Sequence, residues 1–547
     1  IGGGITGAGI LREAARAGVR VLLVEAKDFS WGTSSRSSKM VHGGLRYLKQ
    51  FQLGTTFHSV REREQLLKAG DGLITPLPFL MPIYDASDKL MYQLGLSVYD
   101  LMAARWDHRQ YTPDEIALLI PRLNRDGLNG GFSTEDAQTD DSRLVLRVLQ
   151  EAISAGGTAI NYVRAEGLIQ TETGVRGITI RDAETGATAD IHAQVVINAS
   201  GAWVDHLRNQ LGGEKRIRPL RGSHLLFPAW RFPVAQAISF LHPADRRPIF
   251  VYPWEGVTLV GTTDIDHDDD LNLEPRISGE EVAYLLAACR AQFPGVTVEA
   301  ADILSTFAGV RPVIGTGKAD PSKEARDHVI MVENGMVSVT GGKLTTFRLI
   351  ALDALRAAAP FLSQPLTLDE KAPPLDPLPA IDSMPTLSNE DTRRLRGRYG
   401  AFTVDLSTDP ALLTPVGETR TLWAELCYAA EYEAIVHLDD LLLRRTRIGL
   451  LLPRGGEEQL DRVQEVCAPV LDWDASRWII ERERYLALWK NHYAPPAEIP
   501  DWRRYLENEQ PPVRKPRRVY RVVAAASVIA AAAVMIPRMR RHRARNS

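Results

Sequence analysis

Cysteine is scarce in this chain, and its scarcity argues against two kinds of small scaffold. Cys289, Cys427 and Cys467 are the only cysteines among 547 residues, and they have no paired spacing. Neither a disulfide framework nor a cysteine-based zinc site is therefore indicated, and a reducing compartment fits best. With 44% hydrophobic residues, the chain is long enough for about three or four structural units with a large core.

A hydrophobic segment that would easily span a membrane is not evident. The uncharged run 522–536 holds 15 residues, which make a helix of about 22 Å, short of the roughly 30 Å hydrocarbon core. Five basic residues lie on each side of this run, so the positive-inside rule predicts no orientation for it in a membrane. We expect the protein to associate with the membrane peripherally or through its tail, by snorkelling arginines and anionic lipid. The alternative is a disordered tail.

Acidic residues are lacking in the last part of the sequence. Residues 511–547 carry ten Lys or Arg and no Asp or Glu. Because the whole chain carries −3, residues 1–510 carry −13. An acidic body with a basic tail favours an anionic membrane surface over nucleic acid as the partner. The predicted location is the cytoplasmic face of the membrane.

An initiator methionine and most of a first strand are also missing. About five apolar residues normally precede a glycine loop of the kind described next, and here Ile1 stands alone. We therefore expect that the chain lacks its native beginning, and that any N-terminal signal lies outside this sequence.

The glycine-rich loop at the start of the chain predicts a dinucleotide site. Gly2, Gly4 and Gly7 have the spacing that permits a tight turn, close approach to a pyrophosphate and close helix packing. The apolar strand that follows ends in Glu25, which would accept the ribose hydroxyls. The pyrophosphate would lie at the positive end of a helix at 8–17. A glycine-rich surface turn, the alternative, would not explain Glu25.

Three further segments carry groups suited to a dinucleotide or its substrate. The Ser-rich loop 28–44 offers hydroxyls and backbone amides for phosphate or ribityl contacts. A late strand ends at the small-residue turn 198–203, where a doubly wound sheet would bring a second loop to the dinucleotide. Lys343 follows two glycines at a helix start. The helix dipole disfavours a cation there, and such local conflicts often mark function.

Hydrophobic patterns predict the other elements in outline. Helices are expected at 57–69, 140–155 and 279–292 and after Lys343. The region from 389 to about 491 is also expected to be helical, with a Leu-rich amphipathic stretch at 422–452. Strands are expected at 77–84 (Pro-punctuated, or a sheet edge), 174–182, 189–198, 224–227, 249–252, 258–262 and 337–340.

Several cationic side chains could surround one anionic substrate, since guanidinium groups match phosphate and carboxylate. The candidates are His42, Arg46 and Tyr47, then Arg221 with His224, then Arg311 and Lys343. An isolated histidine is more often structural, and an arginine more often forms a surface ion pair. The acidic run 266–270 could be a metal cluster, but adjacent acids supply no fixed geometry, so we expect a solvated loop and no metal.

Together these motifs resemble the FAD-dependent glycerol-3-phosphate dehydrogenases. The resemblance is carried by the glycine loop and by segments 33–48, 261–264, 309–312 and 341–348. The Ser-rich run joined to His42-Gly43-Gly44-Leu45-Arg46-Tyr47 is specific to that family. The resemblance covers residues 1–360 strongly and extends to 433–449, where Leu443-Arg444-Arg445-Thr446-Arg447 is similar to the family's C-terminal domain.

The resemblance implies an activity and a set of site residues. FAD would be the dinucleotide, and a hydride would pass from C2 of sn-glycerol 3-phosphate to flavin N5, giving dihydroxyacetone phosphate. The electrons would go to a membrane quinone. Arg46, Tyr47, Arg311, Arg326 and Lys343 would surround the substrate, and either His224 or Arg311 would assist removal of the hydroxyl proton. Because arginine is a poor base, we favour His224 for the proton and Arg311 for the phosphate or the developing oxyanion. The residues expected to hold FAD are Gly2, Gly4, Gly7, Glu25, Thr33, Ser34, Ser35, Lys39, His42, Gly43, Gly201, Gly341, Gly342 and Thr345.

The predicted fold is α/β, with a discontinuous Rossmann-like FAD-binding domain, an inserted β-sheet-rich substrate domain and a C-terminal helical domain. The predicted ranges are 1–75, 131–215 and 309–360 for FAD, 76–130 and 216–308 for substrate, 361–387 for a linker, 388–510 for the helices and 511–547 for the tail. The alternatives to a quinone-linked dehydrogenase are an oxidase that uses oxygen and a flavin-binding protein without turnover. A homodimer is possible.

Overall fold

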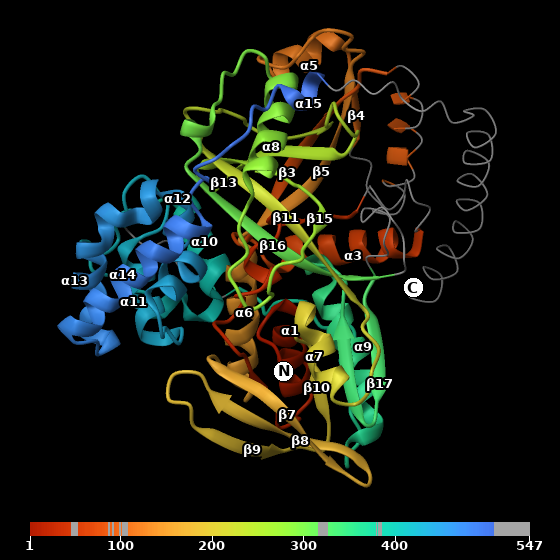
Figure 1. The fold of residues 1–547 in the computed structure, drawn as a ribbon, viewed down its shortest axis with the longest axis vertical. Coiled ribbons are helices and arrows are strands. Elements are labelled where there is room, and N and C mark those ends of the chain that lie inside the picture. Colours follow the sequence, from red (N-terminus) through yellow and green to blue (C-terminus); the bar gives the residue numbers. More distant parts are fainter. Residues whose placement is uncertain are drawn as a thin grey trace.

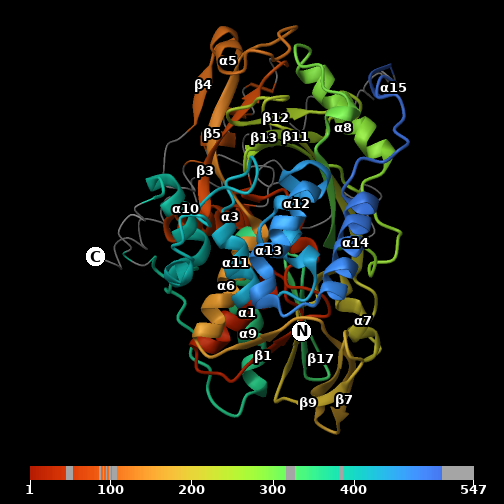
Figure 2. The same ribbon diagram turned by 90° about the vertical axis from the view of Figure 1, so that its left-hand side faces the viewer.

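The fold is mixed α/β with a helical C-terminal part (Figures 1 and 2). The computed structural model describes residues 1–44, 53–85, 88–89, 92–93, 95–97, 100, 108–315, 327–378, 380 and 386–507. A nucleotide-binding unit forms one end of the molecule, a large sheet forms the other, and the C-terminal helices lie against one side of both. The predicted fold class is confirmed.

Short parallel ladders form the centre of the nucleotide-binding unit. They pair β1 (Leu22–Val24) with β6 (Thr158–Ile160), and β10 (Val196–Asn198) with β18 (Met336–Thr340), beside which β17 (Val329–Glu333) runs antiparallel. The helix α1 (Ile5–Arg16) packs between α6 (Asp141–Ser154) and α9 (Phe347–Ala358). Gly9 permits this approach, because a Cβ there would lie 2.9 Å from the ring of Phe347.

The first two residues join these ladders into one sheet. Gly2 N donates to Val24 O at 2.9 Å on one side. On the other side the Ile1 amino group donates to Ile197 O at 2.8 Å, and Ala199 N donates to Ile1 O at 2.9 Å. Ile1 and Gly2 therefore take the place of the central strand that the sequence almost lacks.

A three-stranded antiparallel sheet extends this unit. It comprises β7 (Val163–Thr171), β8 (Gly174–Asp182) and β9 (Thr188–His192). The sequence predicted β8 correctly and missed β7. The single strand expected at 189–198 is wrong, because this stretch divides between β9 and β10, which pair in different sheets.

The largest sheet has ten strands, in the order β15, β11, β14, β13, β12, β3, β5, β2, with β16 beside β11 and β4 beside β5. Their bounds are β2 (Met40–Val41), β3 (Ile74–Pro82), β4 (Arg109–Tyr111), β5 (Gly131–Thr139), β11 (Ile217–Pro228), β12 (Ala237–Leu241), β13 (Pro248–Trp254), β14 (Val257–Gly261), β15 (Ile265–Asp266) and β16 (Ser305–Ile314). The helices α5 (Pro113–Leu119) and α8 (Gly279–Gln292) contribute to the buried core on one face.

Strand pairing in this sheet corrects one expectation. β3 lies between β12 and β5, so it is not a sheet edge. Its pairing with β12 involves only Phe79 and Leu80, so the prolines of β3 need not donate hydrogen bonds to that strand. β5 (131–139) and β16 (305–314), which lie at the predicted domain boundaries 131 and 309, both pair within the large sheet.

The C-terminal part consists mainly of helices: α10 (Asn389–Tyr399), α11 (Trp423–Tyr432), a π-helical turn (Asp440–Arg445), α12 (Ile448–Leu451), α13 (Leu460–Leu471), α14 (Ala475–His492) and α15 (Arg504–Glu507). The Leu-rich stretch 422–452 forms several short helices and not one continuous helix. Ala434 (φ 52°) and Arg447 (φ 63°) have left-handed backbones, which interrupt a right-handed helix.

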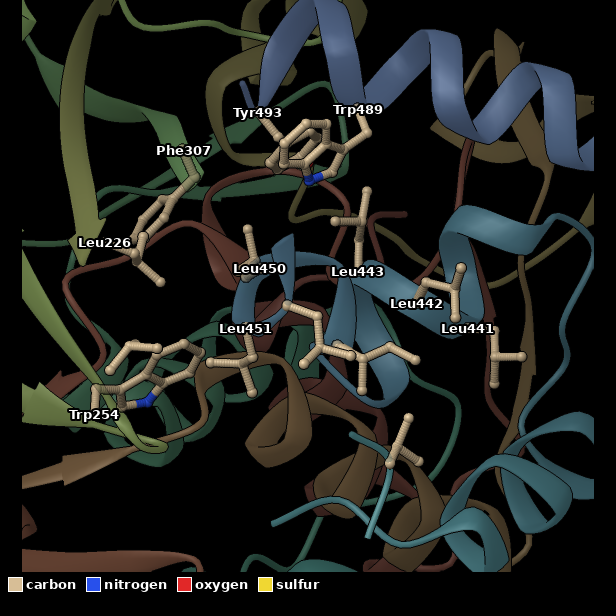
Figure 3. Close-up of a cluster of buried hydrophobic side chains, with 14 of the residues drawn as sticks. Leu226, Trp254, Phe307, Leu441, Leu442, Leu443, Leu450, Leu451, Trp489 and Tyr493 are labelled. Carbon is tan, nitrogen blue, oxygen red and sulfur yellow. The ribbon is translucent and has the colours of Figure 1, made fainter. Parts of the chain in front are cut away.

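An apolar cluster attaches these helices to the large sheet (Figure 3). Leu443, Leu450 and Leu451 come from the helical part, and Trp254 and Phe307 come from β13 and β16. All five are nearly or fully buried. Burial on this scale makes the helical part an integral layer of the molecule and not a loosely tethered domain.

Candidate active site

Two adjoining cavities lie at the carboxyl ends of the parallel strands, where open α/β sheets bind their ligands. Their volumes are about 1110 Å³ and 280 Å³. Both are lined by Thr33, Ser37 and the segment 341–344. They form one elongated site, with the glycine loop at the smaller cavity and the large sheet at the larger one.

The glycine loop has the form that a dinucleotide requires. A Cβ at Gly7 would lie 1.8 Å from Gly2 O, so helix and loop can approach only without a side chain there. A Cβ at Gly4, which lines the smaller cavity, would lie 2.9 Å from Ser34 Oγ. Both predicted roles, close packing and close backbone approach, are therefore compatible with the structure.

Glu25 lies at the smaller cavity with a fixed carboxylate. Oε2 accepts from Gly3 N at 2.6 Å, and Oε1 accepts from Lys27 N at 2.9 Å. Burial raises the pKa of Glu25, against the lowering effect of these two amides. Each oxygen keeps a further lone pair for a hydroxyl donor. The carboxylate thus fits ribose, as the sequence predicts.

The sequence analysis missed one wall of the smaller cavity. Trp31 and Trp203 line it with ring centroids 5.9 Å apart. The Lys27 ammonium lies 3.6 Å from the centroid of the Trp31 ring, and burial lowers its pKa to about 8. The position of Lys27, two residues after Glu25, was the sequence signal that could have predicted a cation at this cavity.

The Ser-rich loop contributes only some of its predicted residues. Thr33 and Ser34 line the smaller cavity, and Ser34 Oγ accepts from Ile5 N at 3.0 Å. Ser35 and Lys39 line neither cavity, because the Lys39 ammonium is buried and donates to Ser35 O and to Asp141 Oδ1, both at 2.8 Å. The structure therefore does not bring Ser35 and Lys39 to the cofactor site.

Other predicted cofactor residues lie around the junction of the cavities. Gly201 lines the smaller cavity, Gly341 and Gly342 line both, and His42 and Thr345 line the larger one. Gly201, Gly341 and Gly342 have positive φ angles of 59°, 77° and 79°, a backbone that favours glycine. Gly43 does not line either cavity; its N–H donates to Asp136 at 3.0 Å.

Two predicted cations reach the larger cavity. Arg311 on β16 donates from Nη1 to Asp264 Oδ1 at 2.9 Å and from Nη2 to Thr262 Oγ1 at 3.2 Å. Lys343 donates from Nζ to Ser59 Oγ at 2.9 Å. Both cations are thereby held in place at one wall of the cavity. The predicted substrate residues Arg46, Tyr47 and Arg326 lie outside the described residues.

His224 lies behind the cavity wall. It is 1% exposed, stacks on Phe307 at 4.5 Å and does not line either cavity. Its Nε2 lies 2.9 Å from Oγ of Ser38, which does line the larger cavity. Burial, with the nearby charges of Arg311 and Lys39, lowers the pKa of His224 well below its usual value, so the imidazole is neutral.

The large sheet and the segments beside it supply further parts of the larger cavity. Phe79 and Phe250 form an apolar floor, with ring centroids 5.9 Å apart. Asp136 on β5 also faces it, and burial raises its pKa to about 6 despite the charge of Arg63. Arg247 lines the cavity and donates to Asp264 O at 2.6 Å. The sequence offered no motif for these residues, which strand pairing brings together.

Two other candidates belong elsewhere. Arg221 pairs with Glu281 at 2.9 Å and does not line either cavity. In the acidic run, Asp266 pairs with Arg218 at 2.6 Å. Within the described ranges, no three His, Cys, Asp or Glu side chains gather as a metal site would require. None of the helices described is long and apolar enough to cross a membrane.

Comparisons with known proteins agree with this geometry. The family of FAD dependent oxidoreductases matches residues 1–348, and the C-terminal domain of alpha-glycerophosphate oxidase matches residues 357–478. Glycerol-3-phosphate dehydrogenase 2 of Mycobacterium tuberculosis is 34% identical, covering 89% of this chain and 87% of the relative. Aerobic glycerol-3-phosphate dehydrogenase of Staphylococcus haemolyticus is also 34% identical, covering 87% of this chain and 91% of the relative.

A solved structure extends the likeness to three dimensions. The glycerol-3-phosphate dehydrogenase of Bacillus halodurans, complexed with FAD, has a TM-score of 0.70 at 27% identity and covers 89% of this chain and 93% of that one. FAD is the cofactor of this chain, and the glycine loop and Glu25 at the smaller cavity fit a dinucleotide. The chain belongs to the FAD-dependent glycerol-3-phosphate dehydrogenase family.

Proposed function

We propose that this enzyme oxidises sn-glycerol 3-phosphate to dihydroxyacetone phosphate and passes the electrons to a membrane quinone. The observation that supports the proposal most is the placement of Arg311 and Lys343 on the cavity that adjoins the FAD site. Fixed cations beside a flavin suit an anionic alcohol. The names of the relatives point to the same substrate.

Each cation has a separate task in this proposal. FAD, when bound, supplies a two-electron acceptor for the hydride at C2 of the substrate. Arg311, oriented by Asp264 and Thr262, stabilises the oxygen at C2 as its proton leaves. Lys343, held by Ser59, contributes a charge to the phosphate. Arg46, Tyr47 and Arg326 remain predicted substrate ligands.

His224 takes the hydroxyl proton through Ser38 in this mechanism. The 2.9 Å contact between Ser38 Oγ and His224 Nε2 provides the connection, since Ser38 lines the cavity and His224 does not. A neutral imidazole can accept a proton, which a permanently charged guanidinium cannot do. The assignment of Arg311 to charge stabilisation and His224 to proton removal rests on this difference.

The acceptor and the location are inferred from the tail. Residues 511–547, outside the described part, are basic around an apolar run, which favours an anionic membrane surface on the cytoplasmic face. A membrane-bound acceptor such as a quinone follows from that location.

Homodimer formation and the domain ranges stay predictions. In this proposal we assign 131–139 and 305–314 to the substrate sheet, because both strands pair within it.

A second candidate, the oxidase, is favoured by the match of residues 357–478 to the C-terminal domain of alpha-glycerophosphate oxidase. A flavin-binding protein without turnover is disfavoured, because it would have no use for fixed cations beside the flavin. Product formation tests the activity itself. The FAD-loaded protein should form dihydroxyacetone phosphate from sn-glycerol 3-phosphate when given a quinone analogue. Failure to form it, with flavin bound, would refute the substrate assignment.

A further inference from the structure

Buried carboxylates connect the C-terminal helices with the Ser-rich loop 28–44: Asp28 pairs with Arg444 and Arg445, and Asp141 contacts Ser37, the loop residue that lines both cavities. Asp141, the first residue of α6, is fully buried. Its Oδ2 accepts from Ser37 N at 2.9 Å and from Ser37 Oγ at 2.7 Å. Its Oδ1 accepts from Lys39 Nζ at 2.8 Å and from the guanidinium of Arg447. Ser37 lines both cavities, whereas Arg447 belongs to the helical part.

The guanidinium of Arg447 is fixed on three sides. Besides Asp141, it donates from Nε to Asp140 Oδ1 at 2.9 Å and from Nη1 to Leu443 O at 2.8 Å. Although burial opposes ionisation, Arg447 and Arg398 lower the pKa of Asp140 to about 2, so this carboxylate carries its charge at neutral pH. A planar guanidinium can span two carboxylates and a carbonyl in this way, and an ammonium cannot.

The helical part does not depend on this polar link for its attachment. Leu443, Leu450 and Leu451 pack beside Trp254 and Phe307 in the apolar cluster of Figure 3. A change at Arg447 can therefore alter the link while the apolar contact persists. Burying several charges costs desolvation free energy, and apolar residues of similar volume would often stabilise a core as well or better. The buried charges therefore suggest a role beyond stability.

We propose that Asp141 and Arg447 are positioning residues, through which the C-terminal helices hold Ser37 and its loop in the conformation that binds FAD. The inference goes beyond the proposed function, because it concerns retention of the cofactor and does not depend on which alcohol is oxidised. Asp141 does not itself line either cavity, so it acts through Ser37.

A double-mutant cycle on FAD affinity tests this connection. The dissociation constant of FAD is measured by flavin fluorescence for the full chain, for Arg447→Lys, for Ser37→Ala and for the double variant. We expect each single change to weaken FAD binding by about tenfold, and the double change to cost little more than either one, because the two residues act through the same carboxylate. Unchanged affinity in Arg447→Lys, or fully additive effects, would overturn the proposal.

A matched control separates positioning from general destabilisation. Arg394 forms a buried pair with Glu425 at 2.6 Å, entirely within the helical part. Arg394→Lys should lower the thermal unfolding midpoint and leave FAD affinity unchanged. If it weakens FAD as much as Arg447→Lys does, the proposal is refuted. Asp141→Asn should weaken FAD as well; should that variant not fold, the Arg447 and Ser37 variants still decide the question.

Discussion

Gly222 lies directly against the guanidinium of Arg311. A Cβ at residue 222 would be 2.4 Å from Arg311 Nη2 and 2.8 Å from Cζ. The two residues belong to the neighbouring strands β11 and β16. The lack of a side chain on β11 therefore decides where the cation of the larger cavity lies, and Asp264 then holds it there at 2.9 Å.

Gly222→Ala is expected to displace Arg311 without unfolding the sheet, because the end of a long side chain can move. The kcat/KM for sn-glycerol 3-phosphate should fall by about tenfold, because one charged contact to the developing oxyanion is weakened. Steady-state kinetics and flavin content measure both effects. Gly167→Ala is the control, since its Cβ would meet Thr179 at an ordinary 3.8 Å. An unchanged kcat/KM in Gly222→Ala would contradict the placement of Arg311 at the substrate.

Arg311→Ala removes the cation altogether. We expect kcat/KM for sn-glycerol 3-phosphate to fall by about a hundredfold or more, with flavin content intact. Arg181→Ala provides a comparison, because Arg181 is 47% exposed and pairs with Glu166 on the surface. Equal activity in the two variants would remove Arg311 from the site.

Gly7→Ala tests the glycine loop at the FAD site. The added Cβ would lie 1.8 Å from Gly2 O, and backbone cannot move away as a side chain can. Purified protein should lose its visible flavin absorbance and unfold at lower temperature. Full flavin content would show that the loop tolerates separation from the helix, and the close-packing role of Gly7 would be wrong.

The pH dependence of stability should report on His224. Its pKa in the folded protein is well below the ordinary value of 6.5, through burial and the charges of Arg311 and Lys39. Below about pH 6.5 the unfolded chain therefore binds more protons than the folded one, and stability falls as the pH drops. In His224→Gln the unfolding midpoint should decrease less between about pH 7 and about pH 5. An identical decrease in both proteins would contradict a buried neutral imidazole.

The sequence predicted features that depend on local spacing. Gly2, Gly4, Gly7 and Glu25 act within one βαβ unit, so their positions along the chain determine their arrangement. Lys39 does not line either cavity, although its neighbours in the Ser-rich loop do, because its side chain turns to Asp141, about a hundred residues away in sequence. Spacing along a loop does not reveal such a distant partner.

The parts that the sequence could not predict depend on pairing between distant strands. Asp136 lies on β5, and Arg247 directly precedes β13. Both reach the larger cavity only because β5 and β13 belong to one sheet. Neither residue lies in a recognisable motif. The breaks between the helices of 422–452 were not predictable for a related reason. Left-handed Ala434 and Arg447 make contacts with residues distant in sequence, and no glycine marks either position.

The most direct test of the proposed function is anaerobic reduction of the bound flavin. Adding sn-glycerol 3-phosphate to the FAD-loaded protein should bleach the flavin absorbance, and a soluble quinone analogue should then restore it much faster than oxygen does. Faster recovery with oxygen would contradict the dehydrogenase and favour the oxidase. If the flavin does not bleach at all, the substrate assignment is wrong.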